Sequence, residues 1–149
     1  MKKRYSNEEL IYYRYFYHKT GIEPEHVILV KNFIFFFVNN TEYFRVKQHL
    51  NLVRKMFYQK IMLIRAETTL MRLLFSFFPD PYIHDVRVEY NIYSRKKIID
   101  ICFLSFEERG IAIGRNGDYI KAVNEIFEKH LIFEESNVPI HIKCSLISI

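Results

Sequence analysis

Tryptophan is absent from this sequence and cysteine is rare, with two residues among 149. Cys102 and Cys144 stand alone in strand-like runs without the CxxC spacing of zinc sites, so we expect buried thiols rather than a disulfide or metal ligands. The six histidines show no HxxxH spacing. The sequence therefore predicts neither a metal site nor a cofactor.

Motifs for nucleotide hydrolysis and for acid–base catalysis are also missing. No GKS or GKT pattern exists that could hold nucleotide phosphates in a P-loop. Two pairs of adjacent carboxylates occur, Glu107 with Glu108 and Glu134 with Glu135. Adjacent side chains point apart, so we expect solvated charges rather than an acid and its base. We therefore expect a protein that is not an enzyme.

Long hydrophobic runs are lacking as well. The run at residues 33–38 is far shorter than the ~20 residues of a membrane-spanning helix. Glu8 and Glu9 interrupt the region where a secretory signal would need its apolar core. We expect a soluble, cytoplasmic protein with no membrane segment.

Acidic residues are scarce in the first half of the chain. Residues 1–66 hold 12 Lys and Arg against 5 Asp and Glu, whereas residues 67–149 hold 10 against 12. A basic half suits contact with a polyanion such as a nucleic acid.

Aromatic residues are abundant, with 14 Phe and 11 Tyr. We attribute them to the codon bias of an AT-rich genome rather than to a surface that stacks bases.

Local patterns predict the order of elements in the first half. Ser6 and Glu9 form a capping box at the start of a helix, and Gly21 is placed to end it. Two apolar runs separated by a polar pair indicate a β-hairpin, and an apolar stripe of helical spacing follows. The expected elements are a helix at residues 7–20, strands at 27–30 and 33–38, a helix ending near residue 57 and a strand at 60–65.

The same order of elements repeats in the second half. Val86, Val88 and Tyr90 alternate with polar residues, which is the period of a half-buried strand, and Pro79 ends the helical stripe before them. The expected elements are a helix at residues 70–78, strands at 86–93 and 97–104, helices at 107–113 and from 118, and a strand at 140–144. The chain is thus predicted to be α+β, with one module at residues 1–66 and another at 67–149, each a three-stranded sheet packed by helices.

Glycine is scarce too, and three of the four glycines fall at positions 110, 114 and 117. A residue without a Cβ adopts positive φ and lets another backbone approach, so Gly114 and Gly117 permit a tight turn against a phosphate. Arg115 can contact that phosphate with two donors, and Asn116 lies beside it in the turn. The helix that begins near residue 118 directs its free N–H groups at the same place.

Apolar residues flank this glycine loop. We expect Ile111, Ile113 and Ile120 to line a groove for bases, together with Ile99 or Ile101. Lys121 is placed to add a second phosphate contact or to remain a solvated lysine. Two glycines also occur in turns that join helices for packing alone, so a purely structural loop is the alternative interpretation.

The second half resembles a type II KH module, and the tandem arrangement is similar to the archaeal NusA-like transcription factors. The residues that carry this resemblance are 7–11 (NEELI) with Thr20 and Gly21, and 110–122 (GIAIGRNGDYIKA). The resemblance implies a protein that binds single-stranded RNA and acts with RNA polymerase in transcription termination or antitermination. It covers nearly the whole chain.

The first module departs from the family pattern. Residues 44–49 read FRVKQH where a GxxG loop is expected, so the close backbone approach is lost there. Arg45 and Lys47 can still offer charges to a phosphate; otherwise they form an ordinary basic helix face. Our hypothesis is that the second module grips RNA while the first adds electrostatic attraction.

Two other functions remain open. KH modules also serve in ribosomal and ribosome-assembly proteins, and a fixed structural role tolerates the loss of one loop. The chain could instead be a polymerase-docking module whose contact with RNA is incidental. Co-purification with polymerase subunits or with a small ribosomal subunit would separate these alternatives.

Overall fold

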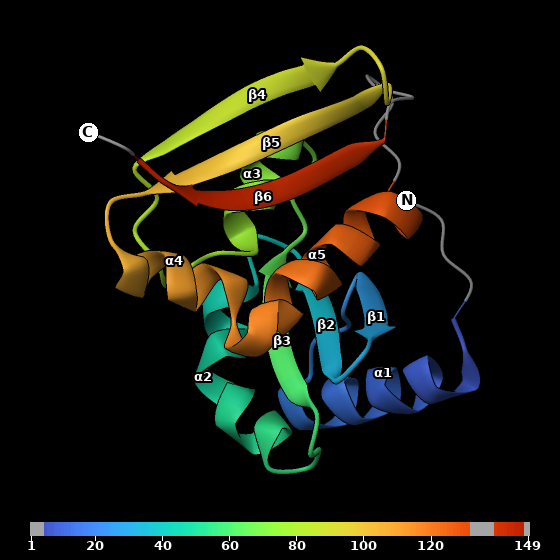
Figure 1. Cartoon of the computed structure of the whole chain (residues 1–149). Coiled ribbons are helices and arrows are strands. Elements are labelled where there is room, and N and C mark those ends of the chain that lie inside the picture. Colours follow the sequence, from blue (N-terminus) through green and yellow to red (C-terminus); the bar gives the residue numbers. More distant parts are fainter. Residues whose placement is uncertain (1–4, 132–138, 148–149) are drawn as a thin grey trace. The chain divides into compact units, whose positions relative to one another are not determined.

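The computed structural model describes residues 5–131 and 139–147 and shows a mixed α+β chain (Figure 1). The chain divides into two compact units, one ending at Phe77 and the other beginning at Phe78. Each unit holds one three-stranded sheet, so the predicted α+β class and the predicted sheets are confirmed. The division lies beyond residue 66, where sequence analysis places it, because α3 (Leu70–Ser76) contacts β3 (Lys60–Arg65).

The first unit begins with α1 (Asn7–Thr20), which has the bounds expected from the sequence. The side chain of Ser6 accepts a hydrogen bond from the Glu9 N–H at 3.1 Å, and the Glu9 carboxylate accepts one from the Ser6 N–H at 3.0 Å. Gly21 ends the helix with a φ of 71°. The predicted capping box and stop are therefore confirmed.

The sheet of the first unit has the order β1–β2–β3. β1 (His26–Val30) runs antiparallel to β2 (Phe33–Val38), and Lys31 takes a φ of 52° in the turn between them. β3 runs parallel to β2. Parallel neighbours need a crossover connection, and α2 (Tyr43–Arg54) provides it.

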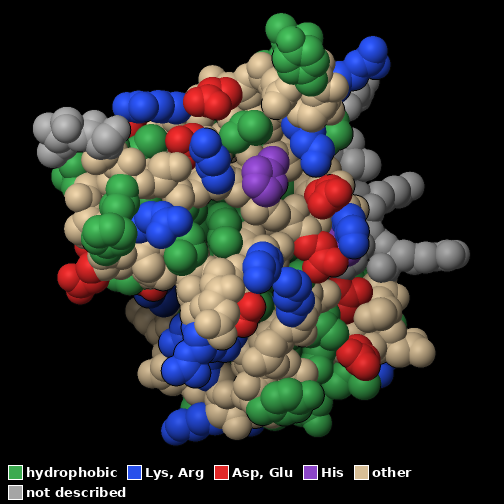
Figure 2. Space-filling model, in the orientation of Figure 1, with side chains coloured by type: hydrophobic (Ala, Val, Ile, Leu, Met, Phe, Trp, Pro, Cys, Tyr) green, Lys and Arg blue, Asp and Glu red, His purple; other side chains and the backbone are tan. Residues whose placement is uncertain are grey.

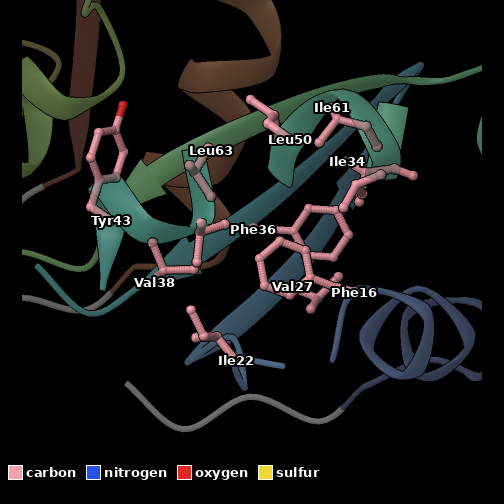
Figure 3. Packing of buried hydrophobic residues seen from close by; sticks show 12 residues of the cluster. Phe16, Ile22, Val27, Ile34, Phe36, Val38, Tyr43, Leu50, Ile61 and Leu63 are labelled. Carbon is pink, nitrogen blue, oxygen red and sulfur yellow. The ribbon is translucent and has the colours of Figure 1, made fainter. Parts of the chain in front are cut away.

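Both faces of β2 are buried, which explains its six consecutive apolar residues. On one face Phe36 stacks on Phe16 of α1, with ring centroids 4.4 Å apart, in the cluster drawn in Figure 3. On the other face the rings of Phe35 and Phe37 each lie 5.8 Å from that of Phe77. Much of the phenylalanine that we attributed to codon bias therefore fills the core.

The second unit repeats the strand topology of the first. β4 (Asp85–Asn91) pairs antiparallel with β5 (Lys96–Phe103), and β5 pairs parallel with β6 (Ile140–Leu146). Ile99 and Ile101 of the central strand are fully buried. The repeat expected from the sequence is therefore present in the order and pairing of the strands.

The two units differ in the connection between their parallel strands (Figure 1). In the second unit this connection comprises α4 (Phe106–Ile113), the 3-10 turn η1 (Arg115–Gly117) and α5 (Asp118–Lys129). The buried aliphatic residues of α5 recur every three or four positions and so form an apolar stripe on one face of the helix. This face packs towards the sheet. A single helix does the same work in the first unit.

Two helices end earlier than the sequence predicts. The second helix, expected to reach residue 57, stops at Arg54. Phe57 continues the apolar spacing because its ring packs edge-on against that of Tyr12 at 4.9 Å, from beyond the helix. The helix expected to reach residue 78 stops at Ser76, and Phe77 and Phe78 are buried outside it. Apolar periodicity marked the buried residues rather than the helix ends.

Within residues 5–131 and 139–147, every helix is too short or too polar to cross a membrane.

Candidate nucleic-acid interface

The glycine loop joins two helices at a sharp turn. Ser105 caps α4 by accepting a hydrogen bond from the Glu108 N–H at 3.2 Å. Gly114 ends that helix with φ 76° and ψ 177°, and its N–H donates to the Gly110 carbonyl oxygen at 3.0 Å. The N–H of Gly117 then donates to the Gly114 carbonyl oxygen at 3.1 Å. One short turn therefore joins the two helices.

Gly114 has a packing reason to lack a side chain. A Cβ at this position would lie 2.7 Å from the Cβ of Tyr119 and 3.2 Å from its backbone nitrogen, both in the first turn of α5. A Cβ contact of 2.7 Å is shorter than real Cβ atoms show, and the positive φ adds strain. The glycine therefore allows α4 and α5 to approach each other, whether or not a ligand binds.

Gly117 has a different reason to be glycine. Its φ is 71°, while a Cβ there would meet only the side chains of Lys121 and Ile120, at 3.9 and 4.0 Å. Asn116 beside it also has positive φ, 56°, a conformation that asparagine tolerates better than most residues. The backbone thus turns through two consecutive left-handed residues, and the space at Gly117 is open.

The polar side chains of the loop face solvent. Arg115, Asn116, Asp118 and Lys121 are all exposed. The Lys121 ammonium group lies 3.5 Å from the backbone oxygen of Asn116, so this lysine is held next to the turn. Two cations and one carboxylate leave the loop with a net positive charge.

The start of α5 adds positive potential to the same place. Its N-cap residue is Gly117, and no side chain caps the helix there. The N–H groups of Gly117 and Asp118 donate to the carbonyl oxygens of Gly114 and Arg115. The helix dipole places partial positive charge at this end, beside Arg115.

Apolar residues flank the loop, though fewer reach the surface than the sequence suggests. Ile111 is 47% exposed, and Ile113 and Ile120 are partly buried. These three flank the loop, and their role in lining a groove for bases stays a prediction. Ile99 and Ile101 are wrong candidates for this lining, because the residues of β5 lie in the sheet core, where both are fully buried.

Two positioning residues were missed by sequence analysis. The side chain of Asn124 accepts from the Ile142 N–H at 2.7 Å and donates to the Ile142 carbonyl oxygen at 2.8 Å. Arg109 donates to the Cys144 carbonyl oxygen at 3.0 Å. Both side chains pair with the edge of β6 that faces away from β5, which fastens α4 and α5 to the sheet. A polar Asn124 beside the apolar stripe of α5 was the signal available.

The cysteine thiols and the possible metal ligands do not form a second reactive site among the described residues. Burial raises the pKa of Cys144 to about 12 and also raises the pKa of Cys102. Both cysteines are free and buried, as expected. In the part of the chain that the structure describes, no three His, Cys, Asp or Glu side chains gather as a metal site would require.

The paired carboxylates are placed only in part. Glu108 lies in the first turn of α4, and its carboxylate accepts a hydrogen bond from the Tyr82 N–H at 2.7 Å. Glu107 precedes it in the same turn and is exposed. Glu134 and Glu135 lie outside the described residues. The placed pair therefore serves the helix start rather than meeting as acid and base.

The first unit has no counterpart of the glycine loop. Residues 44–49 all lie within α2, and Val46 among them is fully buried. Arg45 is exposed and forms an ion pair with Glu42 at 3.4 Å, while Lys47 is exposed. The guanidinium of Arg65 lies 4.4 Å from the ring centroid of Tyr43. Arg45 and Lys47 thus stand on a regular helix surface, apart from any turn that could enclose a phosphate.

The structure is an α+β fold of two units. In one unit a glycine loop with exposed cations joins two helices. A scan against protein-family models and a search of curated proteins each gave no match. Among solved structures, the crystal structure of APE1850 is similar to this chain, with a TM-score of 0.67 and 22% sequence identity. The likeness covers 94% of this chain and 99% of that chain. At this identity it shows the shared fold alone.

Proposed function

We propose that this protein binds single-stranded RNA and that the loop from Gly114 to Gly117 grips the RNA backbone. The proposal extends the sequence resemblance to tandem type II KH modules of archaeal NusA-like transcription factors. In such modules a GxxG loop clamps about four nucleotides by their backbone. Gly114, Arg115, Asn116 and Gly117 hold the backbone, Lys121 adds a charge, and Ile111, Ile113 and Ile120 lie against the bases.

The observation that carries the proposal is the open turn between α4 and α5. Asn116 and Gly117 adopt positive φ, the side chain of Arg115 points to solvent, and the start of α5 has no side-chain cap. A phosphate placed there would meet the guanidinium of Arg115 and the positive end of the α5 dipole, and both attract anions. Gly114 alone does not support the proposal, because the close packing of Tyr119 is enough to explain why this position is glycine.

RNA polymerase is the proposed partner, and its role in termination or antitermination rests on the resemblance alone. A specific observation favours a docking role as a second candidate. The apolar side chains of Ile11, Tyr15 and Tyr17 on α1 are exposed, and aromatic residues are enriched where proteins meet. Polymerase subunits that co-purify with the tagged chain would support docking, and a small ribosomal subunit would favour the ribosomal alternative.

The RNA proposal is tested by fluorescence anisotropy with short labelled single-stranded RNAs, pyrimidine-rich and purine-rich. The test variant combines Arg115→Asp with Asn116→Asp, which places two carboxylates in the turn. Both positions are exposed, and aspartate tolerates the positive φ of residue 116, so the fold is retained. We expect binding to be lost, because two negative charges repel the phosphate.

The matched control combines Lys129→Asp with Asn51→Asp. It changes the net charge by the same amount at exposed helix positions outside the loop. Under the proposal it binds nearly as the native protein does at moderate salt. Equal weakening in both double variants would show that net charge governs binding, and the loop would then be structural.

A further inference from the structure

The hairpin that joins β4 to β5 carries the most exposed aromatic side chain of the described chain. Tyr93 is 99% exposed at the tip, and Tyr90 and Ile92 beside it are also exposed. The turn itself is held by Asn91, whose side-chain oxygen accepts from the N–H groups of Tyr93 at 3.0 Å and Ser94 at 3.2 Å. The aromatic rings are thus presented on a structured turn rather than buried in either core.

Cations surround these rings. Residues 90–97 include Arg95, Lys96 and Lys97 and no acidic residue. In the described part of the chain none of the three forms an ion pair, and Lys97 is the cross-strand partner of Tyr90. Where Figure 1 shows β4 turning into β5, Figure 2 shows hydrophobic and basic side chains together at the surface. Cross-strand partners lie on the same face, so a ring and a charge are neighbours there.

Exposed tyrosine rings beside cations favour single-stranded nucleic acid as the ligand. Aromatic rings accept the faces of unpaired bases without regard to sequence, and cations beside them neutralise the phosphates between those bases. A folded protein can also cover exposed tyrosines. The exposed Glu89 precedes Tyr90 and shares a sheet face with Lys96, so the three cations leave the hairpin with a net positive charge. That charge favours a strongly anionic partner, as RNA is.

We infer that the tip of the β4–β5 hairpin is a second contact site for single-stranded RNA. Tyr90 and Tyr93 stack on bases, and Arg95, Lys96 and Lys97 hold the adjoining phosphates. The inference rests on the proposed binding of RNA at residues 114–117 and deepens it. Because a GxxG loop holds about four nucleotides, a very short RNA occupies the loop alone, whereas a longer strand also reaches the hairpin.

Length-dependent anisotropy tests the hairpin. Labelled RNAs of 5 and 15 nucleotides are titrated against the native protein and against the Tyr90→Ala/Tyr93→Ala variant. We expect the variant to bind the 15-nucleotide RNA at least tenfold more weakly, since each stacked base contributes strongly to affinity. Its affinity for the 5-nucleotide RNA should remain unchanged. A Tyr90→Phe/Tyr93→Phe variant keeps both rings and should bind as the native protein does.

Tyr58→Ala is the matched control, because Tyr58 is 89% exposed in the first unit and the same side chain is removed. It should bind both RNAs normally. Equal affinity of the Tyr90→Ala/Tyr93→Ala variant and the native protein for the 15-nucleotide RNA would overturn the hairpin site. If the Arg115→Asp/Asn116→Asp variant still lost binding, the proposed function would stand without it.

Two other outcomes would also overturn the hairpin site. If the native protein self-associates in sedimentation experiments without RNA and the Tyr90→Ala/Tyr93→Ala variant does not, the hairpin is a contact between copies of this chain. If the native protein binds neither RNA, the loop and the hairpin fail together, which identifies the proposed function itself as wrong.

Discussion

The two units share one sheet topology and differ in what crosses between the parallel strands. In each, an antiparallel pair is followed by a parallel strand, and a helix side chain pairs with an edge strand: Glu9 with the Leu29 N–H at 3.0 Å, and Asn124 with Ile142. The first unit crosses with one regular helix, whereas the second crosses with two helices and a glycine turn. The shared parts serve the fold, and the difference is where a binding role is free to reside.

The half of the chain with the positive net charge is not the half that contains the glycine turn. Cations are concentrated in residues 1–66, while the turn that can enclose a phosphate lies in the half with an acidic excess. Diffuse charge acts over a Debye length of about 10 Å and mainly raises association rates, whereas a formed turn fixes orientation. Under our account the two properties are divided between the units.

Replacing the two loop glycines separately has the largest expected effect. Gly114→Ala forces a Cβ to within 2.7 Å of Tyr119 at a φ of 76°, and we expect a loss of about 2–5 kcal/mol of stability from overpacking and strain together. Gly117→Ala meets no close atom, so strain alone costs about 1–2 kcal/mol. Urea denaturation followed by circular dichroism measures both. Equal losses would mean that α4 and α5 do not pack as described.

Asn124→Ala comes next in size. It removes two hydrogen bonds to Ile142, and we expect a loss of about 1–2 kcal/mol, reduced in part by the better helix propensity of alanine. Asn51→Ala is the control, since Asn51 is exposed on α2 and its change should stay within about 0.5 kcal/mol. Similar results for both variants would show that the edge of β6 does not depend on Asn124.

Removing charge from α2 tests whether the first unit only attracts RNA. With Arg45→Ala and Lys47→Ala, the slope of log affinity against log salt should become less steep by about 1.4, at about 0.7 per phosphate contact on a single strand. Affinity at low salt should fall modestly. The slopes come from anisotropy titrations at several salt concentrations. An unchanged slope would remove α2 from the RNA-binding surface.

Alkaline pH should weaken the second unit slightly through its thiols. Burial raises the pKa of Cys144 to about 12 from an ordinary value of 9.0, so the folded state keeps the neutral thiol. The resulting stability is complete below about pH 9 and is lost as the pH rises towards 12. Cys144→Ala should therefore show a shallower fall in unfolding free energy between pH 8 and pH 10.5. Parallel pH dependences in the two proteins would contradict this.

The sequence predicted the elements well where local chemistry sets them. The bounds of α1 follow from the Ser6–Glu9 capping box and Gly21, and the strands follow from apolar runs or alternation between turn residues. The half-burial predicted for β4 is wrong, because nearly all of its residues, Val88 among them, are exposed. Helix ends without such signals were less accurate, because the ring of Phe57 remains in the apolar pattern while lying outside α2. Contacts between distant residues were not visible at all, and the pairing of Asn124 with Ile142 is one of them.

The candidate site was predictable in part for the same reason. A turn is local, so Gly114, Arg115, Asn116 and Gly117 could be identified from spacing. The lining of a groove depends on how a sheet and its helices pack, which is why Ile99 and Ile101 were misplaced. The alternation predicted a half-buried strand through residue 93, whereas β4 ends at Asn91 and Tyr90 and Tyr93 are both exposed.

Mapping the bound RNA by amide chemical shifts tests the central claim most directly. An isotope-labelled sample of the 18.2 kDa protein is titrated with a 5-nucleotide RNA, which is long enough for the loop and too short to extend far beyond it. The account predicts that the largest shifts fall at Gly114, Arg115, Gly117 and the first turn of α5, with small changes along α2. Largest shifts along α2, with the glycine loop unchanged, would contradict it.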